Sequence, residues 1–103
     1  MCFVEKVYLK TREFPSDELY GLTSQLSRAV TSIVLNIAEG QGKGTSKDFG
    51  RFLRVSRGSA YEVNTILQIC LRLGYINEEE YVNFRESVVQ ITKMISGLIK
   101  SLE

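Results

Sequence analysis

Histidine and tryptophan are both absent from this chain of 103 residues. Without histidine, the sequence lacks the commonest general base, the commonest metal ligand and any Ser–His or Cys–His nucleophile pair. Only two cysteines occur, Cys2 and Cys70, too few and too far apart for a disulfide framework or a metal cage. Cys70 lies on an apolar helix face, so we interpret it as a small core residue.

Proline occurs only once, which leaves room for long helices. No run of about 18 apolar residues is present, so no transmembrane span is predicted. The opening segment Met1–Lys6 lacks the basic-then-apolar order of a secretory signal, and we expect a cytoplasmic location. The length predicts one domain over residues 1–103, with roughly two-thirds of the unfolded surface buried on folding.

The apolar spacing follows the helical period, and no alternating strand pattern occurs. The predicted helices run from about Phe3 to Glu13, from the cap at Ser16 to Ala38 or Glu39, from Lys47 to Leu73, and onward from the capping box that Asn77 opens. The last has a heptad seam of Tyr81, Phe84, Val88, Ile91, Ile95, Leu98 and Leu102. The fold class is therefore all-α, an antiparallel up-down four-helix bundle with short loops.

Glycines punctuate the middle of the chain. Gly40 suits the left-handed position just past the end of the second helix. In the third helix, Gly58 lies among the small residues Ser56, Ser59 and Ala60. A glycine inside a helix costs up to about 1 kcal/mol relative to alanine, a cost that close packing usually offsets. We therefore expect Gly58 to lie at a close helix crossing, facing the second helix near Ala38.

The segment Gly40–Lys47 superficially resembles a phosphate-binding loop. It follows a helix instead of a strand, however, and it lacks the Gly-Lys-Ser/Thr ending of the nucleotide motif. A chain-reversing turn accounts for it better. No nucleotide, metal or other cofactor is predicted.

Positive charge is concentrated in the middle of the chain, where residues 28–57 carry six positive and two negative side chains. Lys47, Arg51 and Arg54 are spaced i, i+4, i+7 and share one face of the third helix, with Lys43 in the preceding loop. Such a row can follow the phosphates of a nucleic acid. A solvated helix face produces the same pattern, so both interpretations stay open. Base stacking has little support because the nearby phenylalanines belong to the apolar face.

Four further polar residues are candidates for structural roles near the crossing of the central helices. Glu39 and Glu62 are expected to be partly buried and to pair with Arg57 and Arg28. Catalysis by paired carboxylates finds no support, because no second acid or metal motif accompanies either residue. Asn36, on an otherwise apolar helix, is expected to bond a neighbouring helix or loop.

Several separated segments recur in a known pattern: Tyr20–Leu26, Arg28-Ala29, Ser32-Ile33, Asn36–Gly40, Phe49, Arg51–Leu53, Arg57–Ser59, Glu62 and Leu73–Ile76. Together, over about residues 14–102, they resemble the bacterial four-helix bundle proteins encoded in intervening sequences of 23S ribosomal RNA genes. The resemblance implies a homopentamer. It also implies a shortened first helix here, because the family's Trp-containing opening segment has no counterpart. A distant relative is the accessory protein of diversity-generating retroelements, which works with a reverse transcriptase and binds nucleic acid.

Two functional hypotheses follow. The first is a non-enzymatic, oligomeric protein that associates with nucleic acid, specifically structured RNA, through the basic face of the third helix. The second is a protein-interaction scaffold that recruits a nucleic-acid enzyme such as a reverse transcriptase. Salt-dependent binding to structured RNA separates the two hypotheses.

Overall fold

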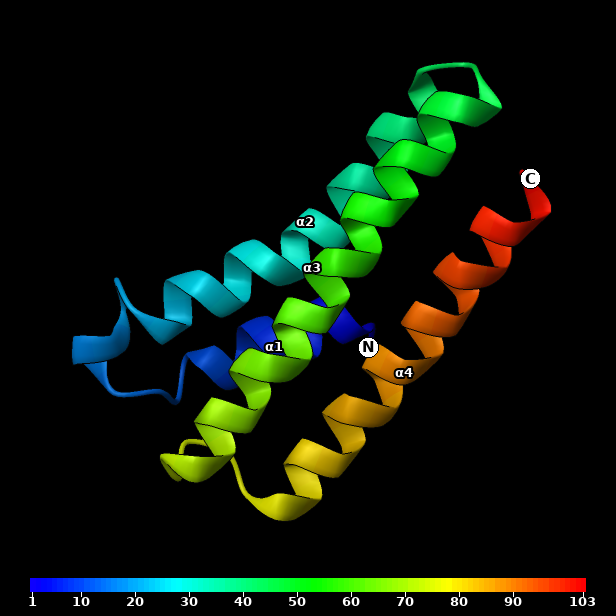
Figure 1. Cartoon of the computed structure of the whole chain (residues 1–103). Helices are drawn as coiled ribbons and strands as arrows, with labels where there is room; N and C mark the ends of the chain where they lie inside the picture. The colour runs from blue at the N-terminus through cyan, green and yellow to red at the C-terminus, as the bar shows by residue number, and fades with distance from the viewer.

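The computed structural model describes residues 1–103 and contains helices only (Figure 1). The elements are α1 (Phe3–Thr11), a short 3₁₀ turn η1 (Ser16–Glu18), α2 (Leu22–Gly42), α3 (Ser46–Arg72) and α4 (Glu78–Ser101). In Figure 1, α2 and α3 form a long antiparallel hairpin, and α4 returns alongside α3. The much shorter α1 contacts both α2 and α4. The all-α four-helix bundle predicted from the sequence is confirmed.

The predicted starts of α3 and α4 are confirmed by their capping hydrogen bonds. Thr45 Oγ1 accepts from the backbone N–H of Asp48 at 3.2 Å, which fixes the first turn of α3. At α4, Asn77 Oδ1 accepts from the Glu80 N–H at 2.8 Å, and Glu80 accepts from the Asn77 N–H at 2.9 Å. This reciprocal pair is a capping box, which satisfies two helix-end donors at once.

The predicted limits of the second helix are wrong at both ends. Ser16–Glu18 forms a separate 3₁₀ turn, and α2 itself begins only at Leu22. At the other end, α2 continues through Gly40 to Gly42, and the left-handed backbone falls at Gly44 with φ of 84°. Gly40 is buried against α3, so this packing stabilises the extra helical turn that the glycine alone would disfavour. The end of α3 is as predicted, with Gly74 at φ of 80°.

The core is formed by side chains from every helix. Among its largest fully buried members are Val7 on α1, Leu26 on α2, Leu53 and Leu67 on α3, and Ile95 on α4. Burying a side chain of this size stabilises the fold by roughly 1.5–3 kcal/mol relative to leaving it exposed. The core therefore joins all four helices into one cooperative unit.

The predicted heptad seam of α4 holds in its middle and shifts near its C-terminal end. Val88 and Ile95 are buried as expected, but Leu98 is 41% exposed and its neighbour Ile99 is buried instead. A straight helix has 3.6 residues per turn, so a strict seven-residue repeat drifts around its surface. By the last two turns, the drift has moved the buried position forward by one residue.

The small residues of α3 do line its contact with α2, but Gly58 is not among them. Ser56 is fully buried, and its hydroxyl donates to the Ile33 carbonyl of α2 at 2.8 Å. Ser59 shares a hydrogen bond of 2.8 Å with Ser32. Gly58 is exposed, and a methyl group built on it would meet nothing within 4 Å.

The close approach lies at Gly40 instead. A Cβ atom there would lie 2.8 Å from Phe52 Cβ and 3.0 Å from Phe49 Cδ1. Ala38, the expected partner of Gly58, is exposed. Gly58 lies two residues from both Ser56 and Ala60, about 200° around the helix, so it points away from the face that those two residues bury.

Alanine substitution at the two glycines is expected to shift stability in opposite directions. Gly40→Ala overpacks the α2–α3 contact and should lower the free energy of unfolding by about 1–3 kcal/mol. Gly58→Ala adds a methyl in open space and should raise it by about 0.5–1 kcal/mol through helix propensity. Chemical denaturation of both variants measures the difference, and a loss of stability in Gly58→Ala would contradict this assignment of the contact.

Candidate nucleic-acid interface

The predicted basic residues gather near the tip of the α2–α3 hairpin and are all exposed. Lys43 follows the last residue of α2, and Lys47, Arg51 and Arg54 lie on α3. The fold brings Lys43 and Arg51 together over one ring. The Lys43 Nζ lies 5.8 Å from the Phe52 ring centroid, and the Arg51 Cζ lies 4.6 Å from it.

Phe52 is a part of this surface that sequence reasoning missed. The apolar pattern of α3 assigns it to the core, and its side chain does pack close to Gly40. The ring is nevertheless only partly buried, and the cations of Arg51 and Lys43 cover it. Cation–π contacts of this kind are worth about 0.5–1 kcal/mol at exposed sites. An aromatic residue directly beside an arginine was the available signal.

Three of these four cations have an acidic neighbour. Lys43 Nζ lies 3.6 Å from Glu39 Oε1, and Arg51 Nη2 lies 3.5 Å from Asp48 Oδ1. Arg54 Nη2 lies 3.5 Å from Glu103 Oε1 at the other end of the chain. All three pairs are solvent-exposed and long, and such pairs contribute about 0–1 kcal/mol. The cations can therefore exchange these partners for an external anion at low cost.

Of the two glutamates expected near the helix crossing, only Glu62 has the expected partner. Arg28 Nη2 on α2 donates to Glu62 Oε2 on α3, which confirms that pairing. Glu39 is exposed and neighbours Lys43 in its own helix, so the expected partial burial is wrong. Its position on α2 faces outward, one residue before the buried Gly40. Arg57 pairs with neither acid and donates to Ser96 Oγ on α4 at 3.1 Å.

Asn36 does not bond a neighbouring helix, contrary to expectation. Its Nδ2 donates to the Ser32 carbonyl at 2.8 Å and to Ser32 Oγ at 3.0 Å, both within α2. The Ser32 hydroxyl is the group that reaches α3, through Ser59. The amide side chain therefore supports the contact indirectly, because one turn of helix places Ser32 between it and α3.

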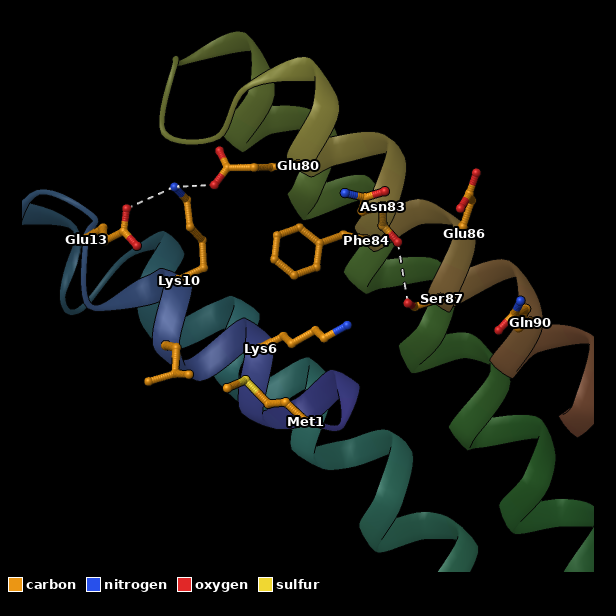
Figure 2. A pocket seen from close by; sticks show the side chains of 11 residues that line it. Met1, Lys6, Lys10, Glu13, Glu80, Asn83, Phe84, Glu86, Ser87 and Gln90 are labelled. Carbon is orange, nitrogen blue, oxygen red and sulfur yellow. Dashed lines mark hydrogen bonds and ion pairs between the residues drawn. The ribbon is translucent and has the colours of Figure 1, made fainter.

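A surface pocket of about 500 Å³ lies between α1 and α4, apart from the basic residues (Figure 2). Lys10 dominates it: its Nζ lies 2.8 Å from Glu80 Oε2 and 3.1 Å from Glu13 Oε1. The hydrogen bond to Glu80 raises the pKa of Lys10, and the hydrogen bond from Lys10 lowers the pKa of Glu80. Since Lys10 engages both carboxylates, this site fastens α1 to α4 and offers no free acid–base pair.

The remaining chemistry-bearing residues form no recognisable site. No group of three or more His, Cys, Asp or Glu side chains is placed to hold a metal ion. Cys70 is fully buried, and burial raises the pKa of its thiol to about 11, as suits the core residue that the sequence predicted. None of the helices has the length and apolar character needed to cross a membrane.

With this geometry in view, the relatives can be compared. Residues 1–97 match the family described as 23S rRNA-intervening sequence protein. This chain belongs to that family. The resemblance recognised from spaced residues is thus confirmed, and the match extends through α1.

One solved structure shares the fold of this family member. It is a protein from Bacteroides thetaiotaomicron, described as of unknown function and from the S23 ribosomal protein family. The TM-score is 0.82 at 25% sequence identity, and the alignment covers 94% of this chain and 88% of the other. No curated sequence matches this chain. The comparisons therefore establish family and fold, and they name no reaction.

The Lys10–Glu80 pair should make stability depend on pH in a defined window. Glu80→Gln keeps the capping box, because Gln also serves there, but it removes the charge. We expect a loss of about 0.5–1 kcal/mol near neutral pH, modest because Glu80 is partly solvated. The lowered pKa of Glu80 means that this stabilisation is present above its ordinary value of 4.5 and is lost as the pH falls through the lowered one.

Urea denaturation of wild type and Glu80→Gln across pH 2–9 measures this difference. The two stability curves should converge at the acid end. On the alkaline side the difference should persist at least to pH 9, because the pKa of Lys10 is raised above its ordinary value of 10.5. A difference that stays constant into strong acid would contradict the role of the ion pair.

Proposed function

We propose that this protein is a non-enzymatic, oligomeric protein that associates with nucleic acid, specifically structured RNA, in the cytoplasm. The observation that supports this most directly is the exposed row Lys47, Arg51 and Arg54 on one face of α3, with Lys43 beside it. Lys47 forms no ion pair, and the ion pairs of the other three are long and exposed. Such cations are available to phosphate oxygens.

The geometry favours contact with the phosphate backbone over contact with bases. Lys47 and Arg54 are seven residues apart, which is about 10 Å along a helix. The one aromatic ring within this surface, Phe52, is already covered by Arg51 and Lys43. Single-stranded nucleic acid is usually held by bases stacked on open aromatic faces, and paired RNA by its shape and backbone. A structured RNA is accordingly the better fit.

Self-association as a homopentamer is a second part of the proposal. The number five comes from the resemblance to the family, and exposed apolar side chains on several helices support association itself. Those with about half or more of their surface exposed are Val34 and Leu35 on α2, Val55 and Tyr61 on α3, and Met94 on α4. In a ring, the basic row would be repeated around the assembly. Repetition raises the local positive potential and adds avidity to a weak single site.

The alternative function is a scaffold that recruits a nucleic-acid enzyme such as a reverse transcriptase. The same exposed apolar side chains support it, since they can serve a different protein as well as a second copy. Under this alternative the basic row is only a solvated helix face.

Neutralising the row should separate these two functions. In the triple variant Lys47→Gln, Arg51→Gln and Arg54→Gln, the fold should persist because all three side chains are exposed. Affinity for a structured RNA should fall, because each lost phosphate contact lowers the slope of log affinity against log salt by about 0.9. Fluorescence anisotropy over a salt series measures both quantities. A folded triple variant with unchanged affinity and slope would favour the scaffold.

The assembly is tested independently of RNA. Light scattering at micromolar concentration should give a mass several times the 11.7 kDa of one chain, and five times that mass for the proposed pentamer. A monomer at all concentrations would contradict self-association, while leaving RNA binding by single chains open to the salt titration.

A further inference from the structure

Two stretches of the bundle carry several cations and no acid. The first is Phe49–Tyr61 on α3, which contains Arg51, Arg54 and Arg57. The second is Ser87–Leu102 on α4, which contains Lys93 and Lys100. Elsewhere the helices mix the two signs, as in the acidic start of α4. Five positive charges without a negative one are therefore confined to two segments far apart in sequence.

These two stretches lie side by side. Arg57 Nη1 on α3 donates to Ser96 Oγ on α4 at 3.1 Å. Closer to the hairpin tip, a Cβ atom built on Gly50 would lie 4.0 Å from Leu102 Cδ1. Figure 1 shows the green first half of α3 running antiparallel to the orange and red second half of α4. Antiparallel packing thus brings the two acid-free segments together.

The lysines of α4 share the face that Ser96 presents to Arg57. Lys93 precedes Ser96 by three residues and Lys100 follows it by four, and these spacings place side chains on one face of a helix. Both lysines are exposed, and neither forms an ion pair. On α3, Arg54 precedes Arg57 by three residues. We call the resulting surface the α3–α4 basic face; it consists of Arg54, Arg57, Lys93 and Lys100.

We propose that the α3–α4 basic face is the second half of the RNA interface and holds the backbone of a double-stranded segment. The inference rests on the proposed function and adds α4 to the interface. The two rows of cations lie on helices whose axes are about 8–10 Å apart, so one ligand can contact both rows. Ser96 lies between the rows, and no aromatic residue separates Arg54 from Arg57 or Lys93 from Lys100. This face therefore suits two lines of phosphates and offers no stacking platform.

One acid borders the face. Glu103 lies 3.5 Å from Arg54, and no other carboxylate forms an ion pair with a member of the face. An RNA phosphate that binds Arg54 must compete with this carboxylate. Glu103 thus lowers the affinity of the face without contributing to it, and its removal supplies a test of opposite sign.

The test neutralises α4 alone and measures binding to a synthetic RNA duplex. Lys93→Gln with Lys100→Gln removes up to two phosphate contacts and should lower the slope of log affinity against log salt by up to about 1.8. At about 0.1 M salt that corresponds to a loss of up to roughly 60-fold in affinity. The matched control, Lys6→Gln with Arg12→Gln, removes the same charge from α1, where both residues are exposed and outside the basic surfaces. It should change affinity less than about twofold.

Two further arms sharpen the result. Glu103→Gln should raise affinity for the duplex, because Arg54 then loses its competitor. The single strand of the same sequence should bind wild type more weakly than the duplex does. Unchanged affinity and slope in the α4 variant, an equal loss in the α1 control, or tighter binding of the single strand would each overturn the inference. If wild type binds no RNA, the proposed function fails; if only the α3 triple variant loses binding, the proposed function stands and this inference falls.

Discussion

The contact between α2 and α3 at Gly40 determines how closely the two longest antiparallel helices of the bundle approach. There is no room for a side chain at this position, since Phe52 and Phe49 occupy the space a Cβ would need. Further along the same contact, the Ser56 hydroxyl reaches the Ile33 carbonyl, and Ser32 reaches Ser59. These contacts fix the rotation of α3 about its own axis. Every surface that α3 presents, including its row of cations, depends on that rotation.

Much of the architecture could be predicted because its signals are local. The capping residues Thr45 and Asn77 and the glycine after α3 act within one turn of chain, so sequence places them correctly. Which glycine faces a partner helix is a different question. Each residue step rotates the side chain by about 100°, and an error of two positions moves Gly58 from the contact to the exposed side. Gly40 was assigned to a helix end because glycine there is a common stop signal, whereas burial overrides it.

The candidate site divides in the same way. Spacing along one helix predicted the row of Lys47, Arg51 and Arg54, since i, i+4 and i+7 share a face on any helix. The pairing of Arg28 with Glu62 was also expected. Contacts between helices could not be predicted from spacing, because they depend on the register of α3 against α4. Arg57 meets Ser96 and Arg54 meets Glu103 only through that register.

The short α1 has a consequence for the order in which the bundle forms. The contacts of α2 with α3, and of α3 with α4, join helices that follow one another through short connections, so closing these loops costs little chain entropy. The contact of Lys10 with Glu80 instead spans most of the chain, and it requires α2, α3 and α4 to be in place. Folding is thus expected to begin at the central hairpin, with α1 docking last onto a nearly complete three-helix core.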